Sequence, residues 1–453
     1  MKQKTAVVGF GCAGYHAVRA MREHGYTGEI DVYTDTAWSP GNPMLTTYYI
    51  YDKISREGTC PFGTMEEIQA KYHFHIEPAA VRRVLSEEKA VLTESGEKRY
   101  YDQILISTGA RAFVPPIPGA DGRNVYSMRT IDDAEKVKKV LETENIRNAV
   151  VVGASMVGIK LVELFHARGI KCTLVDMAPY IFPVSAVPRI AGEIERRLSD
   201  MGVDLAFSKA LQSIEEENGM KKVLFADGQS VSCDLVMMCI GTRANTQVAD
   251  EKIRVNRGIV VDTFMQTSMP DIYSAGDCCE GNNLQTGQTQ LIGIWDNAAK
   301  QGRTAGANMA GAVAAGCGMA GADTAGGGMA GTNIAGSRTV YPGNMLHNIT
   351  HFMGMDFIGY GDVSAKGEEY VYENQEKGQM FVVLIKDGVP VCMNFLDSYG
   401  ASGVLKSYML KRMAGSRDGL SQVARVRMIH EGIPEKMIDL LMKEKENDNG
   451  ESN

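Results

Sequence analysis

The chain has 453 residues, enough for two or three domains that each build a core of their own. Hydrophobic residues make up 44% and charged residues 23%, and the net charge of −8 without a Lys/Arg-rich run argues against nucleic-acid binding. No apolar run approaches the ~18 residues of a membrane helix, and the short N-terminal run breaks into glycines too early for a signal peptide, so we expect a cytoplasmic protein without membrane contact.

The first motif is "TAVVGFGCAGYHAVRAMREHG", followed by the strand-like "EIDVYTD". An apolar strand, a compact turn, an amphipathic helix and a second strand together predict a βαβ unit. Gly9 permits a tight turn, Gly11 lets the backbone approach a pyrophosphate, and Gly14 allows close packing of helix and strand. The G-x-G-x-x-G pattern in this context predicts a dinucleotide site with its phosphates at the helix N-terminus.

The next stretch, "SPGNPMLTTYYIYDKI" (residues 39–54), contains no cysteine. Cys60 follows shortly after it, in "GTCPFG", where a structural role is the favoured interpretation.

A second βαβ unit is predicted by "NAVVVGASMVGIKLVELFHARG" and "KCTLVDM". Its turn has Gly153 and Gly158, but Ser155 replaces the middle glycine; serine is small enough to keep the close approach.

In each unit an acidic residue is expected after the second strand, where it binds a ribose hydroxyl. Asp35 is the candidate in the first unit, with Thr34 as the alternative occupant of that position. Asp176 is the candidate in the second unit, and its carboxylate favours NADH over the 2′-phosphate of NADPH.

Residues 305–338 are rich in Gly and Ala, and a decapeptide beginning at Met309, Met319 and Met329 is repeated three times. Ten residues are too few for a repeat with its own core, so a surface loop is predicted. Beyond it, "GEEYVYENQEKGQMFVVLIKDGVPVCMNFLD" predicts antiparallel strands, and "SGVLKSYMLKRMA" and "PEKMIDLLMKEK" predict helices.

Metal and disulfide chemistry are not expected. The nine cysteines show no CxxC spacing, and the adjacent Cys278 and Cys279 are interpreted as two packed thiols. His347 and His351 have the spacing of a zinc helix but lack a glutamate and a third ligand.

Five motifs in order resemble the pyridine nucleotide–disulfide oxidoreductase family of flavoproteins with two dinucleotide-binding domains. Besides the two Gly-rich loops, they are "YYDQILISTGARAFVPPIPG", "CDLVMMCIGTRANT", and "GIVVDTFMQTSMPDIYSAGDCCE" with "IWDNAAKQGRTAGANMAG". The resemblance implies FAD and NAD(H) as cofactors. It implies the FAD-binding residues Gly9, Gly11, Gly14, Asp35, Val81, Thr108, Gly109 and Asp277, and the NAD-binding residues Gly153, Ser155, Gly158, Asp176 and Gly241.

The resemblance also implies the chemistry: NADH passes hydride to the flavin, with Trp295 and Lys53 as possible flavin neighbours. Relatives with a redox thiol carry it in the region of residues 39–54, and this chain does not. Lys160 also replaces a glutamate that is frequent in the family. A thiol–disulfide reductase is therefore the least favoured function and would need Cys12, Cys60 or Cys278 beside the flavin.

The predicted fold is α/β, with Rossmann-like FAD and NAD domains and a C-terminal α+β domain. The expected boundaries are 1–112 and 235–338 for FAD (with the repeat loop 309–338), 113–234 for NAD, 339–440 for the C-terminal domain, and 441–453 for a disordered tail.

The favoured function is an NADH:acceptor oxidoreductase that passes electrons to an iron–sulfur carrier such as ferredoxin or rubredoxin. The alternatives are direct reduction of O2, quinone or another small molecule, and a flavoprotein subunit with a structural or regulatory role in a larger complex. A homodimer is expected.

Overall fold

The computed structural model describes residues 3–36, 38–311, 338–415 and 420–442. Contacts divide the chain into two compact units. Unit 1 contains Met1–Phe113, Met128–Glu142 and Gly241–Asn344, and unit 2 contains Val114–Ser127, Thr143–Ile240 and Met345–Asn453. Most of the predicted repeat loop (312–337) and of the predicted tail (443–453) lies outside the described residues.

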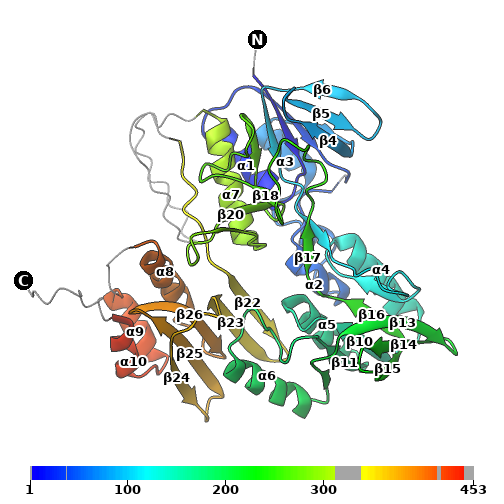
Figure 1. Ribbon diagram of the computed structural model, residues 1–453, viewed down its shortest axis with the longest axis vertical. Helices are drawn as coiled ribbons and strands as arrows, with labels where there is room; N and C mark the ends of the chain where they lie inside the picture. The colour runs from blue at the N-terminus through cyan, green and yellow to red at the C-terminus, as the bar shows by residue number, and fades with distance from the viewer. Residues whose placement is uncertain (1–2, 37, 312–337, 416–419, 443–453) are drawn as a thin grey trace, which may run out of the picture. The chain divides into compact units, whose positions relative to one another are not determined.

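Unit 1 is built on a parallel sheet of five strands in the order β19-β7-β1-β2-β3 (Figure 1). These strands are β1 (Lys4–Val8), β2 (Glu29–Tyr33), β3 (His75–Glu77), β7 (Gln103–Ile106) and β19 (Ile272–Ser274). The central strands are almost fully buried, as their continuous apolar runs predict for a sheet covered on both faces.

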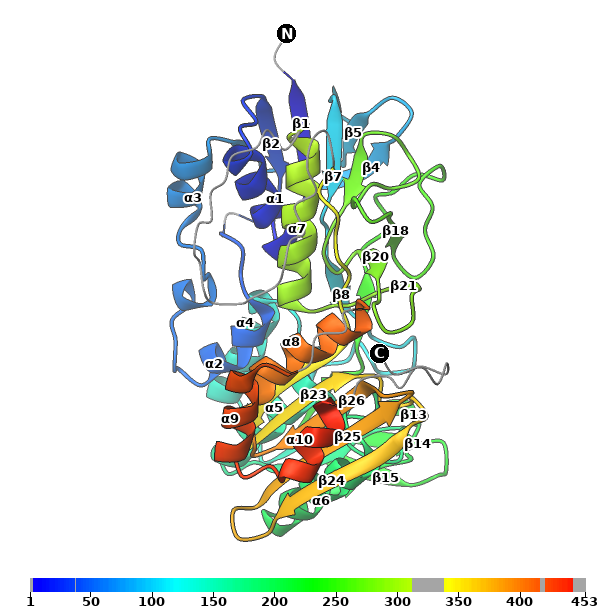
Figure 2. The same cartoon turned by 90° about the vertical axis from the view of Figure 1, so that its left-hand side faces the viewer.

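Helices α1 (Cys12–Glu23) and α7 (Trp295–Met309) lie side by side in unit 1 (Figure 2). The other helices of the unit are α2 (Thr46–Ile50), α3 (Met65–Tyr72) and α4 (Ile131–Thr143), whose last residue is assigned to unit 2. Antiparallel strands add β4 (Val81–Leu85), β5 (Ala90–Thr93) and β6 (Lys98–Tyr100), and the ribbon of β8 (Ala110–Ala112) with β17 (Thr242–Ala244). A small mixed sheet consists of β18 (Ile259–Val260), β20 (Cys279–Asn282) and β21 (Thr289–Gln290).

Unit 2 has a second parallel sheet of five strands, in the order β12-β11-β10-β16-β9. The strands are β9 (Val125–Ser127), β10 (Asn148–Val152), β11 (Lys171–Val175), β12 (Asp204–Ala206) and β16 (Leu235–Met238). Helices α5 (Met156–Ala167) and α6 (Pro188–Asp200) accompany it, with the antiparallel strands β13 (Leu211–Glu217), β14 (Met220–Phe225) and β15 (Ser230–Cys233).

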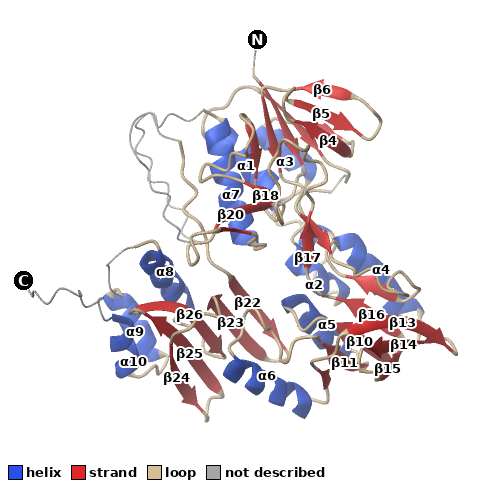
Figure 3. Ribbon diagram, viewed as in Figure 1, coloured by secondary structure: helices blue, strands red, loops and turns tan. Residues whose placement is uncertain are grey.

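The C-terminal part of unit 2 is an antiparallel sheet in the order β22-β23-β26-β25-β24, followed by three helices (Figure 3). The strands are β22 (His347–Phe352), β23 (Met355–Gly361), β24 (Glu368–Asn374), β25 (Gln379–Lys386) and β26 (Val389–Leu396). The helices are α8 (Ser402–Met413), α9 (Gln422–His430) and α10 (Glu435–Met442). Together with the two parallel sheets, this confirms the predicted fold class.

No helix in the described residues combines the length and the apolar character needed to cross a bilayer. The division into FAD, NAD and C-terminal domains that the sequence suggests stays a prediction.

Candidate functional site

The first Gly-rich loop of unit 1 is shaped by the absence of side chains. Gly9 has a φ of +93°, and a Cβ there would lie 2.6 Å from the Ser107 carbonyl oxygen. A Cβ on Gly14 would lie 2.5 Å from the Gly9 oxygen, whereas a Cβ on Gly11 would meet nothing within 4 Å. The loop is therefore closed on the side of the sheet and open at Gly11.

The open side of this loop fits a dinucleotide phosphate. Gly11 is the N-cap of α1, and no side chain caps the N–H groups of the first turn. Those N–H groups and the positive end of the helix dipole favour an anion at this position.

Helix α7 approaches α1 so closely that neither Gly302 nor Gly306 has room for a side chain. A Cβ on Gly302 would lie 2.3 Å from the Ala13 oxygen, and one on Gly306 would lie 2.2 Å from the Ala17 oxygen. The Cys12 thiol donates to the Trp295 carbonyl at 3.5 Å, so the N-terminal ends of the two helices meet. The spacing of Gly302 and Gly306 could have indicated from the sequence that this helix packs closely against another one, although not that the other helix is α1.

Asp277, between β19 and β20, lies at the same end of unit 1. A Cβ on the preceding Gly276 would lie 2.9 Å from the Ala13 Cβ, which places this loop against the start of α1. The Asp277 carboxylate accepts a hydrogen bond from an Nη of Arg129 at 2.5 Å, and the Arg129 Nε donates to the Ala110 carbonyl at 3.3 Å. Sequence reasoning missed Arg129 because it is 148 residues away from Asp277 and fell in the segment assigned to the other domain.

Two buried ionisable groups on α1, Cys12 and His16, are neutral near pH 7. Burial, followed by the nearby Asp277 carboxylate, raises the pKa of the Cys12 thiol to about 12. Burial and then the charge of Arg303 lower the pKa of His16 to about 4. Neither group is suited to act as a thiolate or an imidazolium here.

Thr108 and Gly109 follow β7 and enter the ribbon. The Thr108 hydroxyl donates to the Asn245 carbonyl at 2.6 Å, and the Asn245 amide donates to the Thr108 carbonyl at 3.0 Å. Gly109 has a φ of +66° with open space at its Cβ position. Val81 starts β4, pairs with Thr93 and packs against the core of the unit.

The hydrogen-bond register of the two parallel sheets shows which residue of unit 1 is equivalent to Asp176 of unit 2, the position expected to bind ribose. The Gly9 N–H donates to the Tyr33 carbonyl, and the Gly153 N–H donates to the Val175 carbonyl, so Thr34 occupies the position equivalent to Asp176. Asp35 is exposed and one residue further along. The register thus favours Thr34, the alternative that the sequence left open, as the residue at this position. Ribose binding by Asp35 stays a prediction.

The cysteine-free stretch forms a short 3₁₀ turn, Pro43–Leu45, continued by α2. The Asn42 side chain accepts from the Met44 N–H at 3.0 Å, and the Ser39 hydroxyl donates to the Gly63 carbonyl at 2.6 Å. Cys60 lies beside it, with its thiol donating to the Ser39 carbonyl at 3.5 Å.

The two possible flavin neighbours have aromatic surroundings. Lys53 is exposed, and its Nζ lies 4.5 Å from the centre of the Tyr51 ring. Trp295 stacks on Phe62 with ring centres 5.7 Å apart, and Phe62 stacks on Tyr15 at 3.8 Å. Trp295 therefore has at least a packing role at the start of α7.

The second Gly-rich loop, in unit 2, repeats the first with one difference. Gly153 has a φ of +112°, and a Cβ on Gly158 would lie 2.0 Å from its oxygen. Ser155 caps α5 by accepting from the Gly158 N–H at 3.2 Å, and its hydroxyl donates to the Cys239 carbonyl at 3.0 Å. Serine in the middle position therefore stabilises the turn without adding bulk.

Asp176 closes the second loop. Its carboxylate accepts from the backbone N–H of Ala154 at 2.7 Å and of Ala178 at 2.8 Å. Lys160, in place of the family's glutamate, forms an ion pair with Glu163 and donates to the His351 carbonyl. Gly241 starts a segment of unit 1 and has open space at its Cβ position.

Most thiols in the described residues are buried. Cys278 and Cys279 are free and fully buried, and burial raises the pKa of both thiols. Cys60 is partly exposed. No cluster of metal-ligating side chains occurs in the described part of the chain, where His347 and His351 lie on strand β22 rather than on a helix.

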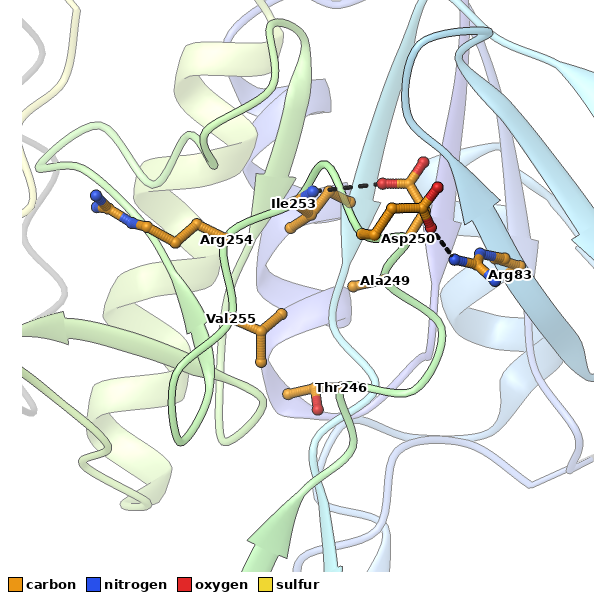
Figure 4. A pocket seen from close by; sticks show the side chains of 8 residues that line it. Arg83, Thr246, Ala249, Asp250, Ile253, Arg254 and Val255 are labelled. Atoms are coloured by element: carbon orange, nitrogen blue, oxygen red, sulfur yellow. Dashed lines mark hydrogen bonds and ion pairs between the residues drawn. The ribbon is translucent and has the colours of Figure 1, made fainter.

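A pocket of about 590 Å³ also opens in unit 1 (Figure 4). It is lined by Arg83, Thr246, Ala249, Asp250, Glu251, Ile253, Arg254 and Val255. Asp250 accepts hydrogen bonds from Ser86 and from the Ile253 N–H, and Arg83 pairs with Glu251. These acidic groups support the loop and are already paired.

Comparison with known proteins agrees with this architecture. The family model described as "Pyridine nucleotide-disulphide oxidoreductase" matches residues 3–302. An NADH oxidase of Methanocaldococcus jannaschii is 29% identical over 318 residues, which cover 69% of this chain and 71% of that protein. The ferredoxin–NAD(+) reductase component of a 3-phenylpropionate/cinnamic acid dioxygenase from Photorhabdus laumondii is 27% identical over 312 residues (68% and 78%).

Among solved structures, a water-forming NADH oxidase from Lactobacillus brevis superposes with a TM-score of 0.79 at 19% identity. The match covers 95% of this chain and 99% of that one, and at this identity it shows the fold alone. The family match spans both Gly-rich loops and Asp277. The chain belongs to the pyridine nucleotide-disulphide oxidoreductase family, whose members are oxidoreductases that use FAD and NAD(H).

Proposed function

We propose that the protein is a thiol-independent NADH:acceptor oxidoreductase that delivers electrons to an iron–sulfur carrier protein. The observation that carries this proposal is the cysteine-free stretch 39–54, which forms a 3₁₀ turn and α2 without a thiol. An NAD(P)H oxidoreductase without a thiol relay must release its electrons from the flavin directly.

Bound FAD would supply the chemistry that the residues themselves lack, namely acceptance of a hydride from NADH and release of electrons one at a time. In this proposal the loop of Gly9, Gly11 and Gly14 binds its pyrophosphate at the N-terminus of α1. Asp277 binds the ribityl–pyrophosphate region, and Arg129 holds the Asp277 carboxylate in place. The uncapped start of α7, whose Ile294 provides no side-chain cap, presents its N–H groups to the same site.

The other residues implied by the resemblance have supporting roles in this proposal. Thr108 and Gly109 line the site where β7 ends, and Val81 packs behind it from β4. Thr34 takes the ribose position in preference to Asp35, because it is the residue in register with Asp176.

In unit 2, Gly153, Ser155 and Gly158 form the NADH turn, and Gly241 lies where the chain returns to unit 1. Asp176 selects NADH, because its carboxylate accepts a hydrogen bond from a free 2′-hydroxyl and repels a 2′-phosphate. Two backbone N–H groups already hold this carboxylate in a fixed orientation.

The choice of an iron–sulfur acceptor is supported by chemistry and by one relative. A ferredoxin-reductase component is among the similar proteins.

Cys60 is the nearest thiol in the sequence to the cysteine-free stretch. Its thiol has no basic partner in the described residues and forms hydrogen bonds only with Thr59 and a backbone carbonyl. A thiolate is what disulfide exchange requires.

A second candidate is an oxidase that transfers electrons to O2 or a quinone. Two relatives named NADH oxidase favour it, from Methanocaldococcus jannaschii and Enterococcus faecalis. The homodimer and the cytoplasmic location suggested by the sequence also stay predictions.

An anaerobic titration with NADH tests the thiol-independent mechanism. Full bleaching of the flavin at about one equivalent of NADH per FAD, without a long-lived charge-transfer band, is expected when flavin is the only redox centre. Uptake of two equivalents would reveal a hidden disulfide and contradict the proposal.

Acceptor assays then separate the two candidates. A [2Fe–2S] ferredoxin, a rubredoxin, O2 and a neutral quinone are compared at equal NADH. Faster turnover with an iron–sulfur protein supports the proposed acceptor, and fast turnover with O2 alone supports the oxidase.

A further inference from the structure

The ribbon of β8 and β17 pairs two arginines at directly opposite backbone positions. Arg111 on β8 is the cross-strand partner of Arg243 on β17, and both side chains are exposed. Like charges at directly opposite positions destabilise an antiparallel pair. This ribbon is short, pairing Ala110–Ala112 with Thr242–Ala244.

Both guanidinium groups are held in position by neutral partners. An Nη of Arg111 donates to the Asn245 side-chain oxygen at 3.0 Å and to Gln247 at 3.4 Å. Asn245 is itself fixed by its bond to the Thr108 carbonyl. The guanidinium of Arg243 lies over the Phe113 ring, 4.2 Å from its centre. These contacts orient the charges without neutralising them.

Several other arginines of unit 1 are paired with carboxylates, although not all of them are. Arg56 contacts Asp132 and Glu135, Arg83 contacts Glu251, and Arg99 contacts Glu77 and Glu97. In the described residues no carboxylate pairs with either ribbon arginine, although the chain has 55 acidic residues against 47 basic ones. A preorganised, unneutralised pair in an acidic protein indicates an anionic partner.

The ribbon is also connected to the predicted flavin site within unit 1. The Ala110 carbonyl accepts from Arg129, whose guanidinium pairs with Asp277. Thr108 and Gly109 precede β8 directly. A partner bound at the ribbon is therefore linked through one arginine to the proposed source of electrons.

We propose that Arg111 and Arg243 form a docking contact for the acidic surface of an iron–sulfur electron carrier. This inference rests on the proposed function. Guanidinium groups bind carboxylates in a planar, two-point geometry, and two of them fit a patch of acidic side chains. A single free anion gains little from exposed charges in water, whereas an acidic protein surface gains association rate from them.

The test compares matched variants of the FAD-loaded enzyme with an acidic [2Fe–2S] ferredoxin as acceptor. The double variant Arg111→Gln/Arg243→Gln removes both charges, and Arg111→Lys/Arg243→Lys keeps them. Arg82→Gln removes one exposed charge from β4 as a control. Reduction of a neutral quinone by NADH monitors the flavin reaction in every variant.

The glutamine double variant is expected to raise the KM for ferredoxin about tenfold at low salt and to weaken its salt dependence. The lysine variant should keep the salt dependence of the wild type, because it retains both charges, while its KM should lie between those of the wild type and the glutamine variant, because it loses the two-point geometry. Quinone reduction should be unchanged, and the melting temperature should change little, because both side chains are exposed.

An unchanged KM and salt dependence in the glutamine variant would overturn the docking site while leaving the proposed function intact. A wild-type enzyme that reduces quinone but neither ferredoxin nor rubredoxin would overturn the proposed function and this inference with it. Saturable competition by inorganic phosphate at constant ionic strength would assign the arginines to a small anion instead.

Discussion

The close contact of α7 with α1 predicts that a single methyl group at Gly302 destabilises unit 1. In Gly302→Ala the added Cβ would lie 2.3 Å from the Ala13 oxygen, about 1 Å short of the 3.4 Å at which ordinary contact begins. The obstacle is a backbone carbonyl, which cannot rotate away as a side chain would. The two helices must therefore separate.

Overpacking of this kind costs about 3 kcal/mol at the upper end of its usual range. Replacing a helical glycine by alanine returns about 1 kcal/mol of helix propensity. The expected net loss is about 2 kcal/mol, which lowers the melting temperature of a unit of this size by about 4–8 °C. Because both helices begin at the predicted FAD site, FAD should also dissociate more readily.

Calorimetry and flavin fluorescence measure both effects, and Gly192→Ala is the matched control. Gly192 is exposed on α6, and a Cβ there would meet nothing within 4 Å. The same substitution should therefore raise stability by about 1 kcal/mol at that site. A Gly302→Ala protein with wild-type stability and FAD affinity would refute the argument from helix contact.

The other predictions concern charge and burial. Asp176→Asn should reduce the preference for NADH over NADPH about tenfold, since it removes one negative charge near the 2′-position. The preference is measured as the ratio of the two kcat/KM values, and an unchanged ratio would show that Asp176 does not select NADH. The pKa of His16 is about 6.5 in the unfolded chain and about 4 in the folded one, so stability should fall by roughly 3 kcal/mol as pH falls through this window. About 2 kcal/mol of that loss should occur between pH 7 and pH 5, and denaturation of His16→Gln at these two pH values should lack this contribution. Cys60→Ala should keep at least half of the NADH:quinone activity, and a loss of two orders of magnitude would show that its thiol relays electrons. Arg129→Met should weaken FAD binding measured by ultrafiltration, because it leaves the Asp277 carboxylate unpaired; equal retention would deny it a positioning role.

The local parts of the fold were predictable from the sequence, because their signals lie within a few residues. The glycines of both loops, the strands before them and the helices after them follow from spacing and apolar pattern. The antiparallel strands β24, β25 and β26 were likewise indicated by alternation and turn residues.

Contacts between distant segments were not predictable in the same way. The pairing of Arg129 with Asp277 and the opposition of Arg111 and Arg243 depend on register between strands or loops more than 100 residues apart. The same limit left the choice between Thr34 and Asp35 open, because one residue of register decides it.

The segmented construction of unit 1 has a consequence for the growing polypeptide on the ribosome. The five strands of the parallel sheet in unit 2 lie between Val125 and Met238, so that sheet can form before the chain is finished. The sheet of unit 1 cannot be completed until β19 has been synthesised. Helix α1 likewise cannot pack against α7 until α7 has been synthesised, more than 270 residues later. Until then the nascent N-terminal segment exposes an apolar helix face, and domains that wait in this way are the ones most exposed to aggregation and to chaperone capture.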